Sequence, residues 1–442
     1  MMINLLPPII SFALGTLVLN YFLTGTKTNP FIKCAFALGL GLGLSSTIAF
    51  SSFFIFQKYY GIYALMLHGS LIVLMALHQW VIQKRRPSLT EGPLLTDTGL
   101  FVITLVLVGI LSYLYARIFP YGGWDAWQVW NFKAKFLFES TGQWKNMFEP
   151  VLWRSSPHYP LLLPLINVWG WTFCREAVST VPFITAILFN IATAGLIFGA
   201  LYELTRSKWS AAAALFPFLN AHYMVLTTAQ YCDHVIGFFL CCTMVSFLLA
   251  MNKDRAPLFG LTGAFLGFLS FAKPEGTVAS GLIFLIFSTL IVFAKRGWKP
   301  ALWLAGCTAA FFTPSLVFKF LLSPGNQTFI NGLTSSVKPS SWLRMQLIIG
   351  YILIELSQIK WGGLWFVILA GLITHFKRCL DKQYLAITIF IAAYAGIIIA
   401  YYWVNTYFEI TWWVSVTFGR ILISLIPLFI LWVGTAVLSP KK

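Results

Sequence analysis

Long apolar stretches alternate with short polar breaks along almost the whole chain. Most are near the length of about 20 residues that a helix needs to cross a bilayer, and they lack the alternation of barrel strands. Without water to bond backbone amides, such stretches are stable in a membrane as helices. The pattern predicts an all-α polytopic membrane protein with about 13 transmembrane helices. The predicted spans are residues 5–23, 34–55, 60–81, 97–118, 178–204, 209–226, 235–251, 256–272, 277–294, 301–322, 361–376, 383–404 and 413–436.

Two further apolar stretches are too short or too interrupted to cross a membrane. Residues 159–174 contain Pro160 and Pro164, and residues 345–358 are followed by a polar segment. We expect both to lie at the interface or to dip into the bilayer. The longest segment outside the membrane, residues 119–177, is predicted to form interfacial helices that cap a cavity.

Charge and composition refine the topology. Hydrophobic residues make up 59% of the chain and charged residues only 10%, and the net charge is +17. Lys and Arg occur singly or in small groups in alternate breaks, which is typical of cytoplasmic loops and does not indicate a nucleic-acid partner. The protein is therefore predicted to lie in a cell membrane with its N-terminus outside and its C-terminus in the cytoplasm. In a eukaryotic cell, the lumen of the endoplasmic reticulum would correspond to the outside. Seven cysteines without CxxC spacing indicate neither a disulfide framework nor a zinc site.

The predicted topology places unusual charged residues on the periplasmic or extracellular face. They are Asp125, Asp233, Lys273, Glu275 and Arg420. Charges at membrane depth are stable only where they face a cavity or a partner. Their common location predicts an active site at the outer membrane surface.

Each of these charges also has a purely structural interpretation. Asp125 would then be a loop acid paired with Lys133 or Lys135, and Asp233 would complement the dipole at a helix N-terminus. Lys273 and Glu275 would form a surface ion pair of little energetic value. Arg420 lies a turn or two inside the last helix, where a buried anion is a better partner than distant headgroups.

Two other motifs have structural explanations of their own. The run Gly39–Gly43 lies inside an apolar stretch, so it predicts close helix packing and not a phosphate-binding loop. His158 and His234 are each either interfacial residues or metal ligands.

In their order and spacing, several motifs resemble the GT-C superfamily of integral-membrane glycosyltransferases, in particular bacterial relatives of the protein O-mannosyltransferases. The likeness covers residues 97–438. The motifs are Trp124-Asp125-Ala126-Trp127, Trp130-Asn131-Phe132-Lys133-Ala134-Lys135, Pro157-His158-Tyr159-Pro160-Leu161-Leu162-Leu163-Pro164, Asp233, Lys273-Pro274-Glu275-Gly276, and Arg420 before Pro427.

The resemblance implies a GT-C-like transmembrane catalytic domain at residues 97–442, preceded by a three-helix extension at residues 1–96. It implies transfer of a sugar from a polyprenyl phosphate to a hydroxyl of a lipid, glycan or protein, with inversion at the anomeric carbon. The chain departs from the family pattern in its N-terminal extension, in the absence of a large periplasmic domain and in having a single Asp where the mannosyltransferase branch has an Asp-Glu pair.

Residue roles follow from the same resemblance. Asp125 is the expected general base, and Arg420 and Lys273 are expected to stabilise the phosphate leaving group. The other candidate substrate contacts are Asp233, Glu275, Lys133, Lys135, Trp124, Trp127 and His158, with Arg344 and Lys338 as reserve cations and Trp130 as a third candidate for sugar stacking. A divalent metal is a possible cofactor, with Asp125, Asp233 and His234 as an incomplete candidate ligand set.

Two other functions use the same features. A transporter or flippase of a lipid-linked or anionic substrate would recognise its cargo with the same outer cations, although no internal repeat of the kind common in transporters is evident. A polymerase or ligase of surface glycans shares the multi-helix plan but takes a glycan chain as donor. All three classes imply contact with membrane lipids.

Overall fold

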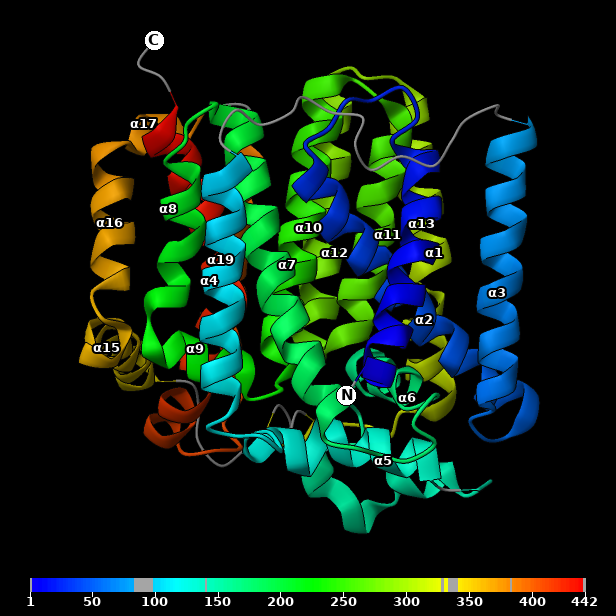
Figure 1. Ribbon diagram of the computed structural model, residues 1–442. Coiled ribbons are helices and arrows are strands. Elements are labelled where there is room, and N and C mark those ends of the chain that lie inside the picture. The colour runs from blue at the N-terminus through cyan, green and yellow to red at the C-terminus, as the bar shows by residue number, and fades with distance from the viewer. Residues whose placement is uncertain are drawn as a thin grey trace.

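A computed structural model describes residues 2–82, 98–139, 141–326, 330–332, 341–381 and 384–439, and these residues form helices and no strand. Most of the long helices run side by side in one bundle, and a layer of shorter helices that includes α5 covers one end of it (Figure 1). We call this the α5 end.

Ten helical segments of the described residues are long and apolar enough to cross a membrane. This confirms a multi-pass helical membrane protein. The helices concerned are α1 (Leu6–Phe22), α2 (Pro30–Phe56), α3 (Gly61–Leu77), α4 (Thr98–Ala116), α7 (Thr180–Thr205), α10 (Cys232–Lys253), α12 (Pro274–Phe293), α13 (Trp298–Val317), α18 (Leu385–Val404) and α19 (Ile410–Leu438).

The other three predicted spans fall on shorter apolar helices, so the total of 13 stays a prediction. They contain α8 (Ser210–Leu215), α11 (Ala256–Ala272) and α16 (Leu364–Thr374). The prediction of one continuous helix over residues 209–226 is wrong. A 3-10 turn that includes Pro217 ends α8, and Asn220 then caps a new helix, α9 (Ala221–Thr228), by accepting from the amide of Tyr223 at 2.7 Å.

The layer at the α5 end comes largely from segments that were not expected to cross the membrane. α5 (Asn131–Glu139) lies across this end of the bundle, and α15 (Trp342–Ser357) is seen nearly end-on in the same view (Figure 1). α6 (Leu162–Gly170) is buried along its whole length, and its nine residues are too few to cross a bilayer. The last short helix, α17 (Phe376–Cys379), lies near the other end of the bundle (Figure 1).

Close helix packing at the glycine run is confirmed. A Cβ atom on Gly41 would lie 1.8 Å from the carbonyl oxygen of Ser11, and one on Gly15 would lie 1.9 Å from that of Ala37. Only glycine allows α1 and α2 to approach this closely. α2 is mostly buried and packs against α6 and α7, so this N-terminal helix is part of the bundle core.

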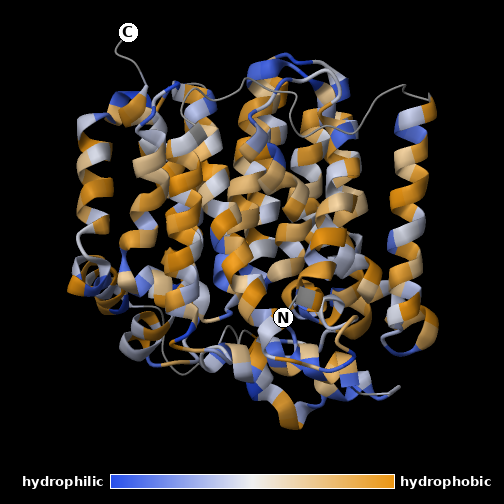
Figure 2. Ribbon diagram, in the orientation of Figure 1, coloured by the Kyte–Doolittle hydropathy of each residue, from blue (hydrophilic) through white to orange (hydrophobic). Residues whose placement is uncertain are grey.

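Hydrophobic residues dominate the middle of the helices, and hydrophilic residues gather toward the two ends (Figure 2). The C-terminal end of α19 lies at the end opposite α5 (Figure 1). Lys253, the last residue of α10, pairs there with Glu203 near the end of α7, and Arg296 pairs with Asp254 in the connections that follow α12 and α10. This arrangement fits a membrane-embedded bundle, and its orientation in the membrane stays a prediction.

Candidate functional site

Five charged side chains from four separate parts of the chain meet at the α5 end. We call them the ion cluster. Asp125 directly precedes a π-helical turn, Asp233 is in the first turn of α10, Lys273 and Glu275 belong to the connection into α12, and Arg420 is on α19. The sequence prediction that these residues share one face therefore agrees with their contacts, while their roles stay predictions.

Arg420 lies between two carboxylates. Its Nη2 atom is 2.6 Å from Oδ2 of Asp125 and 3.0 Å from Oδ2 of Asp233. Asp233 also accepts from Nζ of Lys273 at 2.9 Å through its other oxygen, and the same Nζ lies 3.1 Å from Oε1 of Glu275. The four contacts form one continuous chain of alternating charge, Asp125–Arg420–Asp233–Lys273–Glu275.

The chain of charges is buried at its centre and accessible at both ends. The side chains of Asp233 and Lys273 are 5% and 6% exposed, whereas that of Glu275 is 37% exposed and Asp125 and Arg420 are half-buried. Burial acts to lower the pKa of Lys273, but the carboxylates of Asp233 and Glu275 outweigh it and hold this pKa well above its usual value. Lys273 is therefore a fixed cation at physiological pH.

Backbone geometry places the two buried members. Gln230 has a positive φ of 64°, and Tyr231 is extended, so α10 begins abruptly and Asp233 falls in its first turn, where the helix dipole favours a carboxylate. Lys273 is also extended, and Pro274 starts α12 directly after it. A Cβ on Gly276 would lie 2.2 Å from the carbonyl oxygen of Leu269, so this tight connection requires glycine.

A pair of glycines brings Asp125 to Arg420. Gly122 has a φ of +87°, and a Cβ on Gly123 would lie 2.4 Å from the hydroxyl of Tyr231. The amide of Gly123 donates to the carbonyl of Ala229 at 3.0 Å. Because no side chain intervenes, the loop before Asp125 lies directly on the loop before Asp233.

A row of amides fixes the same two loops. Asn167 donates to Oδ1 of Asn131 at 3.2 Å, and Asn131 donates to Oε1 of Gln230 at 2.7 Å. Gln230 in turn donates to the carbonyl of Pro120 at 3.3 Å. These hydrogen bonds connect α6, α5 and both cluster loops. No spacing of residues along the chain predicts this row.

Two tyrosines contact the cations of the cluster and were not predicted from the sequence. The ring of Tyr231 lies 5.2 Å from the guanidinium carbon of Arg420, and that of Tyr159 lies 5.7 Å from Nζ of Lys273. Both distances are typical of cation–π contacts. The only hint in the sequence was their position beside Asp233 and within the Pro-His-Tyr-Pro motif.

Lys133 and Lys135, the two candidate lysines of the first large loop, lie outside the cluster. Lys133 is fully buried and donates to the carbonyls of Ser156 at 2.6 Å and Tyr159 at 3.2 Å. Burial holds the pKa of Lys133 well below its usual value. Lys135 is exposed and lies 4.0 Å from Glu139. Their contacts in this structure are with the protein's own loop and not with Asp125.

His158 lies beside Tyr159 with its ring edge-on, at a centroid distance of 4.8 Å. Burial, together with the charges of Lys133 and Lys319, lowers the pKa of His158 to about 4. His158 is therefore neutral at pH 7. Of the reserve cations, Arg344 donates to the carbonyls of Tyr402 and Asn405, at 2.9 and 2.6 Å, and Lys338 lies outside the described residues.

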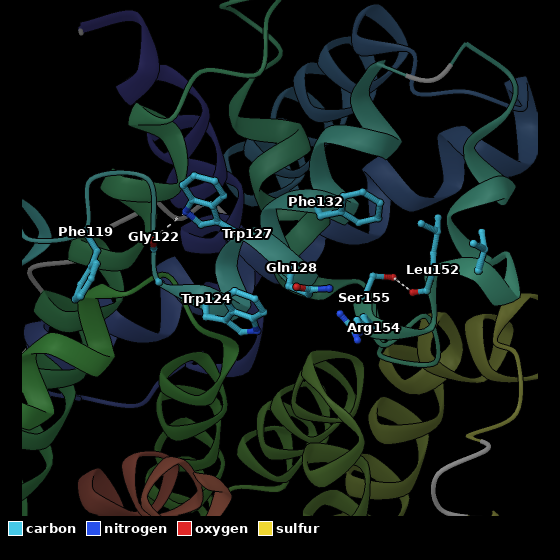
Figure 3. Close-up of a pocket in the computed structure, with 11 residues that line it drawn as sticks. Phe119, Gly122, Trp124, Trp127, Gln128, Phe132, Leu152, Arg154 and Ser155 are labelled. Atoms are coloured by element: carbon cyan, nitrogen blue, oxygen red, sulfur yellow. Dashed lines mark hydrogen bonds between the residues drawn. The ribbon is translucent and has the colours of Figure 1, made fainter.

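Trp124 and Trp127 flank Asp125 and are exposed, whereas Trp130 is fully buried. Both exposed rings line an open groove of about 710 Å³ (Figure 3). The indole nitrogen of Trp127 donates to the carbonyl of Gly122 at 3.1 Å, which fixes that ring at the wall of the groove.

The metal ligand set proposed from the sequence is not assembled. His234 is buried beside Phe189 and Tyr223 and has no ion-pair contact with Asp125 or Asp233 among the described residues. Asp125 and Asp233 are instead held together by a guanidinium. Within the described ranges, no group of three or more His, Cys, Asp or Glu side chains is arranged to hold a metal ion.

A further ion pair, between Glu355 and Lys360, lies next to the turn of α19 that carries Arg420 and was not predicted from the sequence. Glu355 is buried, and its carboxylate binds Nζ of Lys360 at 2.7 Å and the indole nitrogen of Trp361 at 3.2 Å. A Cβ on Gly419 would lie 2.8 Å from Oε1 of Glu355. α15 therefore packs directly on the part of α19 that carries Arg420.

Comparison of the chain with protein-family models, with curated proteins and with solved structures finds no match.

Proposed function

We propose that the protein is a membrane glycosyltransferase that moves a sugar from a polyprenyl phosphate to a hydroxyl acceptor. One observation carries the proposal: the contact at 2.6 Å between Asp125 and Arg420 at the α5 end of a membrane bundle. It puts a carboxylate suited to accept a proton next to a cation suited to bind a phosphate.

The reaction needs both groups. The acceptor hydroxyl gives its proton to the Asp125 carboxylate while its oxygen forms a bond to the anomeric carbon. The bond from that carbon to the phosphate oxygen breaks, and the lipid phosphate leaves with the electron pair. Arg420 and Lys273 stabilise the negative charge that develops on the leaving phosphate. A single displacement of this kind inverts the anomeric configuration.

The burial of the cluster supports this assignment of roles. Asp233 is enclosed and bound by both cations, so it is suited to hold Arg420 and Lys273 in place. Asp125 is more accessible and is bound by Arg420 alone among the cluster residues. Electrostatic stabilisation is strongest where charges are held in a partly dry site, which describes the buried centre of the cluster.

The test is sugar transfer from a panel of radiolabelled polyprenyl-phosphate sugars in membranes that contain the full chain at matched levels. Asp125→Asn is expected to lower transfer by about 100-fold or more, which is the usual loss with a general base. Glu139→Gln is the matched control, because Glu139 is an exposed acid on the same segment that also lies near a lysine. It is expected to keep full activity.

The outcomes separate the competing functions. Equal loss in both variants, or no loss in Asp125→Asn, contradicts the assignment of the base. Donor consumption with retention of the anomeric configuration contradicts direct displacement. Movement of the intact lipid-linked sugar across the membrane without transfer supports the flippase alternative.

A further inference from the structure

The groove beside Asp125 has the features of a carbohydrate-binding site. Its volume of about 710 Å³ is within the range of small-molecule sites. Trp124 is 74% exposed and Trp127 is 64% exposed. An indole face of this kind packs well against the apolar C–H face of a sugar ring.

Polar groups line the groove together with the aromatic rings. Gln128, Ser155 and Arg154 line the same space, and Figure 3 shows Gln128 and Arg154 in a row with Trp124. A sugar ring uses such donors and acceptors around its edge, whereas an acyl chain does not. The segments that line the groove, within residues 119–132 and 151–155, belong to the layer that covers the bundle at its α5 end (Figure 1).

Arg154 adds a preference for negative charge. Its guanidinium carbon lies 5.3 Å from the ring centre of Trp153, and the ion pairs of the described residues do not include it. Of the residues that line the groove, Arg154 alone is charged. A guanidinium without a carboxylate partner favours a carboxylate or phosphate on the ligand.

We propose that the groove binds the acceptor and that the acceptor is an acidic glycan, with a uronic-acid or phosphate group held by Arg154. This inference rests on the proposed function, because Gly123 and Trp124 line the groove and Asp125 is the next residue. Asp125 does not itself line the groove, so the proposal requires a sugar stacked on Trp124 to extend a hydroxyl to the Asp125 carboxylate. The groove thereby specifies a glycan among the three acceptor classes that the sequence left open.

The experiment is binding of the purified full chain, in lipid nanodiscs, to an array of uronic-acid-bearing, phosphate-bearing and uncharged oligosaccharides. Binding of acidic glycans is expected, with uncharged counterparts bound at least tenfold more weakly. Trp124→Ala is expected to lower all binding by about tenfold or more, which corresponds to the loss of one good aromatic contact. Arg154→Ala is expected to lower mainly the preference for acidic glycans.

Trp342→Ala is the matched control for a general role of interfacial tryptophans. Trp342 is 75% exposed at the start of α15, in the same layer of helices but outside the groove, and its loss is expected to leave binding unchanged. The inference is overturned if no glycan binds, if acidic and uncharged glycans bind equally, or if Trp342→Ala lowers binding as much as Trp124→Ala. The array needs neither donor nor turnover, so its result is independent of whether transfer occurs.

Discussion

Removing a buried cation from the ion cluster is expected to cost more stability than removing the buried anion between the cations. The cluster holds three carboxylates and two cations, so its net charge is −1. Asp233→Asn leaves Arg420 with Asp125 and Lys273 with Glu275, two complete pairs and no net charge. Lys273→Met leaves three carboxylates with one cation, a net charge of −2.

The magnitudes follow from burial. Loss of the charge-assisted hydrogen bonds of Asp233 is expected to cost about 2 kcal/mol, because both cations keep a partner. Lys273→Met leaves Asp233, which is 5% exposed, with Arg420 alone, and breaking a buried pair from one side costs about 3–5 kcal/mol. Asp125→Asn removes a half-buried contact and is expected to cost about 1 kcal/mol or less.

The assay is reversible unfolding of the purified chain in mixed micelles of increasing SDS content, with stability read from the fraction unfolded. The loss of stability is expected to be smallest for Asp125→Asn, larger for Asp233→Asn and largest for Lys273→Met. An equal or larger loss for Asp233→Asn than for Lys273→Met would refute the charge balance, and would mean that Asp233 stabilises the cluster by more than its pairing with the two cations.

Three further changes test neighbouring features. Gly419→Ala places a Cβ 2.8 Å from Oε1 of Glu355, so it is expected to lower the stability by about 1–3 kcal/mol. It is also expected to lower transfer, because it moves the turn of α19 that carries Arg420. An unchanged melting temperature would show that α15 can shift to make room for the methyl group. Glu275→Gln removes the most exposed charge of the cluster. It is expected to tighten binding of a polyprenyl phosphate by about threefold to tenfold, because the carboxylate repels the phosphate. Weaker binding would instead show that Glu275 contacts the donor directly. Because the pKa of His158 is about 4 when folded and near its usual 6.5 when unfolded, unfolding takes up a proton between these values and stability falls as pH falls through this window. His158→Gln is expected to reduce that fall by about 2 kcal/mol between melts at pH 7 and pH 4.5, and an unaltered slope would assign the fall to other groups.

The helix positions were predictable because membrane-spanning length and apolar composition are properties of single segments. The predicted span at residues 209–226 failed because Pro217 and the cap at Asn220 divide it, and hydropathy averages over such breaks. The common face of Asp125, Asp233 and Arg420 was predictable as well, since helix counting fixes the end of a bundle at which a loop emerges.

The contacts between residues on that face could not be predicted from the sequence. Lys133 was expected beside the substrate but is buried against carbonyls of its own loop, because its position on α5 points it into the protein. Glu355 and Gly419 are far apart in the chain and meet only through the packing of α15 on α19. Such pairings depend on helix rotation and tilt, which apolar periodicity leaves undetermined when a helix is hydrophobic on all sides.

The charge balance of the cluster also constrains how the proposed reaction begins. A phosphodiester donor brings a further negative charge to a group of side chains whose net charge is already −1, so it cannot simply add to the existing contacts without repulsion. Arg420 has two carboxylate partners, and Asp125 is the more accessible one. Exchange of Asp125 for the phosphate keeps Arg420 paired through Asp233 and releases the Asp125 carboxylate. In the proposed transferase, binding of the donor therefore releases Asp125 to act as the base. Without the donor, the Asp125 carboxylate stays paired with Arg420 at 2.6 Å.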